Sequence, residues 1–115
     1  MKFVCSRDRL TEAISIVQKA VSTRSTLPIL DGILIDVTDK GVQLTGYDLE
    51  TGIEAQLEAD ALESGSVVIN SKLFGEIVRK LPEEEVIIET DDRLLISIIS
   101  GSSVFSIKGL SAEGY

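Results

Sequence analysis

The sequence runs twice through the same order of secondary-structure signals, and this duplication restricts the possible folds more than any other feature. In the first copy, strand patterns at 1–5 and between 33 and 57 flank a helix pattern from Arg7 to Ser22. In the second copy, a strand pattern at 66–69 precedes a helix pattern at 71–80 and three further strands between 85 and 108. Each copy therefore reads strand, helix, strand, strand, strand, which predicts a duplicated βαβββ unit.

The signals of the first copy are specific. Apolar residues recur every three or four positions from Leu10 to Val21, and Ser6 stands where an N-cap is expected. After Pro28 the apolar residues alternate with period two, and Asp39-Lys40-Gly41 has the composition of a tight hairpin turn. The pattern predicts an amphipathic helix followed by an antiparallel meander of three strands.

The second copy has equally clear boundaries. Pro82 ends its helix pattern, and Thr90-Asp91-Asp92 and Ser100-Gly101-Ser102 separate its last three strands. Two such units in 115 residues predict one α+β domain, with two helices on one side of antiparallel sheets.

The composition argues against most classes of enzyme. The chain has no histidine and no tryptophan, and its one cysteine, Cys5, lies in an apolar strand pattern that favours a buried free thiol. We therefore expect no catalytic residues, no metal site and no cofactor. No run approaches the roughly 18 apolar residues of a membrane span, so we expect a cytoplasmic protein without a membrane partner.

Charge is distributed unevenly along the chain. The net charge of −8 argues by itself against a nucleic-acid partner, because duplex binding depends on neutralising phosphates. The two helical regions, 6–24 and 71–81, nevertheless carry seven basic and three acidic residues, a net +4, while the rest carries −12. If both helices lie on one side, that side attracts polyanions and the other repels them.

Helical spacing places Lys72, Glu76 and Arg79 on one face of the second helix. The opposite, apolar face is predicted to consist of Leu73, Phe74, Ile77 and Leu81. A simpler interpretation is that Lys72–Glu76 and Glu76–Arg79 are ordinary surface ion pairs. The first helix exposes Ser15, Lys19 and Ser22, and Arg24 follows among short hydroxyl residues that suit nonspecific phosphate contact.

Four short sequence segments point to a particular protein family. They are Met1-Lys2-Phe3, Arg24-Ser25-Thr26-Leu27-Pro28-Ile29-Leu30, Leu44-Thr45-Gly46-Tyr47-Asp48-Leu49-Glu50, and the run from Lys72 to Pro82. In this order, and over the whole chain, they resemble the N-terminal domain of the bacterial DNA polymerase III β subunit, the β sliding clamp family.

The resemblance implies a non-enzymatic processivity factor of a replicative polymerase. It implies a head-to-tail ring of two three-domain subunits that encircles double-stranded DNA without sequence specificity, with helices toward the DNA. It also implies that polymerase and clamp loader bind to later domains and that residues 1–115 are the N-terminal part of a longer subunit.

The resemblance also assigns residues. It implies DNA contacts by Arg24 and by Lys72, with Arg79 as a secondary candidate. It implies that Phe105 packs against the neighbouring subunit. The further interface candidates are Ser103 and Val104, which flank Phe105, and Leu73 on the second helix. From pattern alone, a sheet-core role for Phe105 remains an alternative.

Two other function classes compete with the clamp interpretation. An enzyme could hold magnesium with Asp91-Asp92, with Asp36 and Asp39, or with Glu83-Glu84-Glu85, but carboxylates in turns are more typically solvated surface groups. An acidic protein-interaction module with no DNA role needs only the same composition, its acidic sheet face binding a basic protein.

Overall fold

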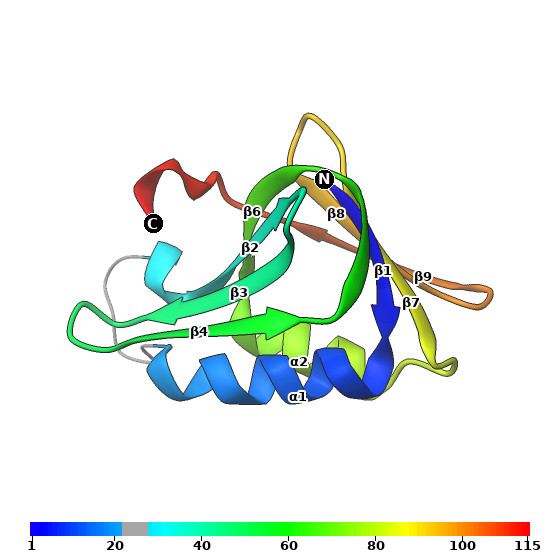
Figure 1. The fold of residues 1–115 in the computed structure, drawn as a ribbon, viewed down its shortest axis with the longest axis horizontal. Helices are drawn as coiled ribbons and strands as arrows, with labels where there is room; N and C mark the ends of the chain where they lie inside the picture. The colour runs from blue at the N-terminus through cyan, green and yellow to red at the C-terminus, as the bar shows by residue number, and fades with distance from the viewer. Residues whose placement is uncertain (22–27) are drawn as a thin grey trace.

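Figure 1 shows a computed structural model of the chain, which describes residues 1–21 and 28–115. The first copy consists of β1 (Lys2–Ser6), α1 (Arg7–Val17), the 3₁₀ turns η1 (Gln18–Ala20) and η2 (Pro28–Asp31), β2 (Gly32–Thr38), β3 (Gly41–Tyr47) and β4 (Gly52–Leu57). After β5 (Ala59–Glu63), the second copy consists of β6 (Gly65–Asn70), α2 (Ser71–Arg79), β7 (Glu85–Thr90), β8 (Leu95–Ser100) and β9 (Ser103–Lys108). A short 3₁₀ turn, η3 (Ala112–Gly114), follows. The duplicated α+β plan is confirmed.

The two copies exchange their first strands. One sheet has the order β5-β1-β7-β8-β9 and the other the order β4-β3-β2-β6, and every pairing is antiparallel. Thus β1 of the first copy lies beside β7 of the second, and β6 of the second lies beside β2 of the first. Neither copy has a complete sheet of its own, so the two fold as one unit.

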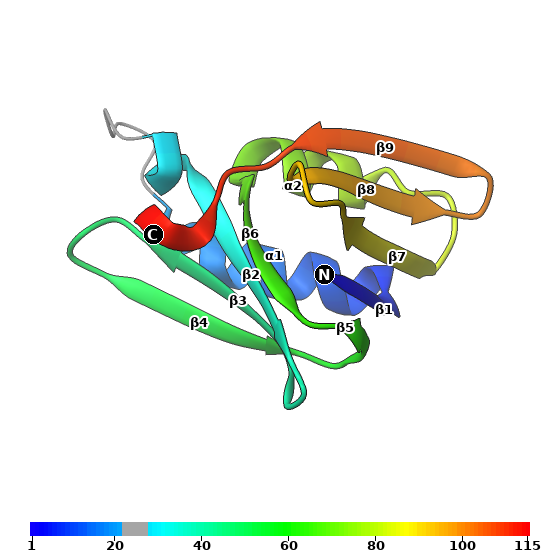
Figure 2. The same ribbon diagram turned by 90° about the horizontal axis from the view of Figure 1, so that it is seen from above.

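Both helices lie on the same side of the molecule, below the two sheets in Figure 1. Figure 2, seen from above, shows the two sheets side by side in front of the helices, with β9 and β4 at opposite margins. One continuous core joins helices and sheets and includes the fully buried Phe3, Leu10, Ile35, Phe74 and Ile88. At about 25 cal/mol per Å² of apolar surface, this burial is the main term that offsets chain entropy.

Local capping fixes where each helix begins. The Ser6 hydroxyl accepts a hydrogen bond from the Arg9 amide, and the Asn70 side chain accepts one from the Leu73 amide. The Ser6 cap was predicted from sequence and is confirmed. The helix itself is shorter than predicted, because the α-helical bonds end at Val17 and tighten into η1.

Two predictions about the pattern were wrong. The strand β5 was missed because its exposed residues show no period-two alternation. On α2, Leu73 was assigned to the buried face, yet its side chain is 46% exposed, and the buried positions are Ser71, Phe74, Gly75 and Val78. Leu81, beyond the helix, is buried as expected. Among residues 1–21 and 28–115, no helix is long and apolar enough to cross a membrane.

Candidate nucleic-acid interface

The side of the molecule formed by α1, η1 and α2 is a helical face with exposed cations. Lys19 of η1, Lys72 and Arg79 of α2, and Lys80 after it are all exposed, as the sequence predicted for the first three. None of these four forms an ion pair with another residue of the described ranges. Their charges are therefore available to a polyanion in solution.

The alternative of simple surface ion pairs on α2 was wrong. Glu76 is exposed, but neither Lys72 nor Arg79 lies within ion-pair distance of it. Arg79 instead turns toward α1, where Nη2 donates hydrogen bonds to Ser15 Oγ and Gln18 Oε1, each at 3.2 Å. The sequence could not show these contacts, because 61 to 64 residues separate the partners.

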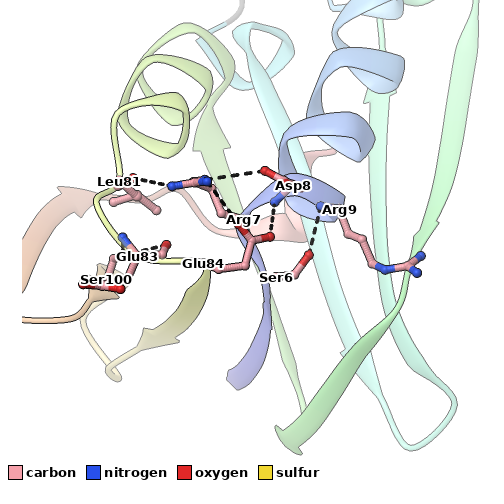
Figure 3. A network of polar contacts seen from close by, with 8 residues as sticks. All are labelled: Ser6, Arg7, Asp8, Arg9, Leu81, Glu83, Glu84 and Ser100. Atoms are coloured by element: carbon pink, nitrogen blue, oxygen red, sulfur yellow. Dashed lines mark hydrogen bonds and ion pairs between the residues drawn. The ribbon is translucent and has the colours of Figure 1, made fainter.

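Two other helical cations do not belong to this available set. Figure 3 shows Arg7 at the start of α1, where its guanidinium contacts Glu84 at 3.1 Å and the Leu81 carbonyl at 3.0 Å. Arg9 pairs with Glu58 at 3.0 Å. Both were counted in the predicted net charge of +4, but they serve mainly to join α1 to the segments that follow α2 and β4.

The network of Figure 3 also explains why the segment after α2 is fixed. The Asp8 amide donates to Glu84 Oε1 at 3.1 Å, and the Glu83 amide donates to Ser100 Oγ at 2.9 Å. The Ser100 hydroxyl in turn donates to the Glu83 carbonyl at 3.0 Å. These bonds hold the N-terminal end of α1 and the C-terminal end of α2 in a fixed relation, which keeps the helical face in one geometry.

The predicted DNA contact Arg24 lies outside the described residues, and so does Ser22. Of the three predicted contacts, the structure therefore places Lys72 and Arg79, and it places both on the helical face. Lys19 and the half-buried Gln18 also lie on this surface, and the buried Gly75 lies beneath Gln18 and Arg79; none of the three was singled out as a site residue. A glycine in the middle of a helix was the one signal available, because it costs about 1 kcal/mol relative to alanine.

The predicted subunit-contact residues lie at another place. Phe105 and Val104 lie on β9, an edge strand, with exposures of 36% and 62%, and Ser103 beside them is half-buried. Leu73 is exposed on α2. Phe105 is not part of the core cluster, so the sheet-core alternative was wrong. Within the described residues β9 pairs only with β8, so Phe105 and Val104 leave apolar surface exposed at an edge of the sheet, a common feature of interaction surfaces.

Two of the carboxylates considered for an enzyme, Asp91 and Glu84, have structural contacts. Asp91 accepts hydrogen bonds from the Leu95 and Arg93 amides. These bonds, with the Leu95 bond as the largest cause, lower the pKa of the carboxyl below its usual value. Glu84 pairs with Arg7. Within the described part of the chain, no three acidic or cysteine side chains are grouped so that they could hold a metal ion.

Cys5 is buried and unpaired, as predicted. Burial, with a smaller contribution from the charge of Glu84, raises the pKa of its thiol to about 12. The thiol therefore stays protonated at neutral pH, and a protonated thiol is a poor nucleophile.

The arrangement of two helices on one side of exchanged antiparallel sheets is shared with solved sliding-clamp structures. A putative DNA polymerase III β subunit from Eubacterium rectale is similar over the whole chain, with 40% identity and a TM-score of 0.97. The sliding clamp of Bacillus subtilis is similar with 40% identity and a TM-score of 0.94. In both cases the chain covers 32% of the solved protein. The fold is thus that of a DNA-clamp domain.

The family model described as the N-terminal domain of the DNA polymerase III β subunit matches residues 1–115. The chain belongs to this family. The β sliding clamps of Halalkalibacterium halodurans and Bacillus subtilis are each 42% identical to it over its full length. The chain spans about a third of these relatives, 32% of each. The alternative of an acidic interaction module without a DNA role has no support among them.

Proposed function

We propose that this chain forms the N-terminal domain of a DNA sliding clamp, a non-catalytic processivity factor of a replicative DNA polymerase III. Its helical face, with Lys72 and Arg79, lies toward double-stranded DNA and contacts phosphates without reading bases. Arg24 is a further proposed contact from sequence. The carrying observation is that exposed cations without described ion-pair partners gather on the helical side, while the sheets and turns are strongly acidic.

The charge distribution supports this orientation. The exposed carboxylates of Glu54, Asp60, Glu63 and Glu85 all belong to strands of the two sheets. A polyanion is therefore repelled from the sheet side and admitted at the helical side, and a full ring of such domains surrounds DNA with the attractive side inward. Few direct contacts are needed, because a closed ring holds DNA topologically.

The test is the salt dependence of binding to a short duplex, measured by NMR titration so that millimolar affinities are detected. Lys72→Ala with Arg79→Ala removes two phosphate contacts, so the slope of log K against log salt is expected to fall by about 2. The matched control is Lys40→Ala with Arg93→Ala, which removes two exposed cations from the β2–β3 and β7–β8 turns, away from the helices in Figure 1. Equal losses in both double variants would contradict the proposed orientation.

The proposed ring also requires a contact between subunits, which we place at Phe105, Val104, Ser103 and Leu73. In the three-domain subunit that the family resemblance implies, Phe105→Arg is expected to convert dimers into monomers, because it puts a charge into an apolar contact. Sedimentation velocity measures the change. Leu62→Arg is the control, since Leu62 is 57% exposed on β5 at the other edge of the same sheet. A Phe105→Arg subunit that stays dimeric places the contact elsewhere.

A further inference from the structure

The seam between α1 and α2 contains a polar network around Arg79. Arg79 Nη2 donates to Ser15 Oγ and to Gln18 Oε1. Gln18 Nε2 donates to the carbonyl oxygen of Ser71 at 3.0 Å. Gln18 thus bridges the first turn of α2 and a side chain from its last turn. The guanidinium of Arg79 is held between the helices by neutral groups alone.

Gly75 provides the space for this network. A Cβ atom at this position would lie 2.8 Å from Arg79 Nη1 and 2.8 Å from Gln18 Nε2, closer than real contacts of a Cβ. Helix propensity does not explain a glycine here, because alanine is about 1 kcal/mol better in a helix interior. The missing side chain leaves a notch in α2, and the polar ends of Arg79 and Gln18 fill it.

The network restrains Arg79 without neutralising it. Ser15 and Gln18 carry no charge, and among the described residues no carboxylate lies within ion-pair distance of the guanidinium. An arginine has five N–H donors, and the bonds to Ser15 and Gln18 use only those of Nη2. Among the described residues, Nε and Nη1 have no hydrogen-bond partner, and Arg79 as a whole is exposed. A restrained, charged fork loses little side-chain entropy when it binds a phosphate.

We propose that Gln18 and the notch at Gly75 are positioning elements that hold Arg79 ready to contact a phosphate of duplex DNA. This inference rests on the proposed function, since it concerns how the same helical face meets DNA. It goes further because it assigns part of the affinity for DNA to two uncharged residues, Gln18 and Gly75. If the network only joined α1 to α2, its loss would lower the free energy of unfolding in proportion to the affinity for DNA.

Gly75→Ala is the decisive variant, because it changes no charge and places a methyl group where the guanidinium lies. The three atoms nearest to the added methyl group belong to the far ends of two long side chains, which can rotate away, and alanine favours the helix. The free energy of unfolding is therefore expected to stay equal or to rise. Binding to a duplex of about 20 base pairs at low salt is expected to weaken three- to tenfold. Gln18→Ala is expected to weaken it similarly, and Arg79→Lys, which keeps the charge but not the fork, should do the same.

The NMR signal of the Arg79 Nε–H group, identified by its absence in Arg79→Lys, reports the contact directly. In the unmodified chain it is expected to shift on addition of the duplex. Wild-type affinity in a Gly75→Ala protein whose Arg79 signal has moved overturns the positioning role, and so does a variant that loses stability in proportion to affinity. If the Arg79 signal ignores DNA while signals around Lys72 respond, this inference fails and the proposed function stands. If no signal of the helical face responds, both fail.

Discussion

Replacing Phe74 by alanine is expected to lower the free energy of unfolding by about 3–5 kcal/mol, the usual cost of deleting a large aromatic side chain from a packed core. Phe74 is fully buried on α2 and belongs to the core that both sheets share. Since domains of this kind are stable by only about 5–15 kcal/mol, the variant loses a large part of its stability. Urea unfolding followed by circular dichroism measures the effect.

Phe105→Ala is the matched control for this change. It removes the same side chain, but Phe105 is 36% exposed on an edge strand and lies outside the core. Its removal is expected to cost less than about 1.5 kcal/mol, because it leaves no enclosed cavity. Comparable losses at the two positions would show that Phe105 is a core residue and would weaken its assignment to a subunit contact.

The sequence distinguishes these two phenylalanines only in part. Phe74 lies on a helix whose apolar spacing predicts burial, and the prediction was right. Phe105 lies in a short strand pattern that suits a core strand and an edge strand equally well, because alternation records which residues share a face and not whether that face is covered. Only the strand order, with β9 at an edge, decides between them.

Local signals predicted most of the elements, whereas the pairing of distant segments could not be predicted. The helices, their sides and the turns follow from periodicity, caps and breakers within a few residues. The exchange of β1 and β6 between the two copies depends on contacts across the whole chain, and β5 has no alternation to reveal it. The helical spacing of α2 gave one error: Leu73 was predicted to be buried and is exposed.

The candidate site shows the same division. Lys72 and Arg79 were expected on the outer face of α2, and both are exposed there. Which cations are available to DNA was not predictable, because Arg7 and Arg9 meet Glu84 and Glu58, far away in the sequence. Counting charges by element therefore predicted the correct side of the molecule but included two arginines that already have partners.

The contact of Gly46 with the backbone of Val17 affects both the stability of the fold and the position of the helical face. It lies on β3 where the end of α1 comes closest, and a Cβ atom there would lie 2.2 Å from the Val17 carbonyl oxygen and 3.1 Å from the Val17 carbonyl carbon. Both are backbone atoms, so no side-chain rotation relieves the overlap. Gly46→Ala is expected to push α1 and η1 away from the sheet and to lower the free energy of unfolding by about 1–3 kcal/mol.

The matched control is Gly52→Ala on the neighbouring strand β4, where the nearest atom to an added Cβ is Tyr47 Cδ1 at 3.6 Å, an ordinary contact. There alanine is expected to be neutral or to stabilise by a few tenths of a kcal/mol, because it restricts the unfolded chain. Gln18 follows Val17 directly and holds Arg79, so Gly46→Ala is also expected to move the Arg79 Nε–H signal, whereas Gly52→Ala leaves it in place. Equal stability of the two variants, measured by thermal and urea unfolding, would show that α1 accommodates the methyl group without moving. In that case the close approach at Gly46 does not fix the helical face.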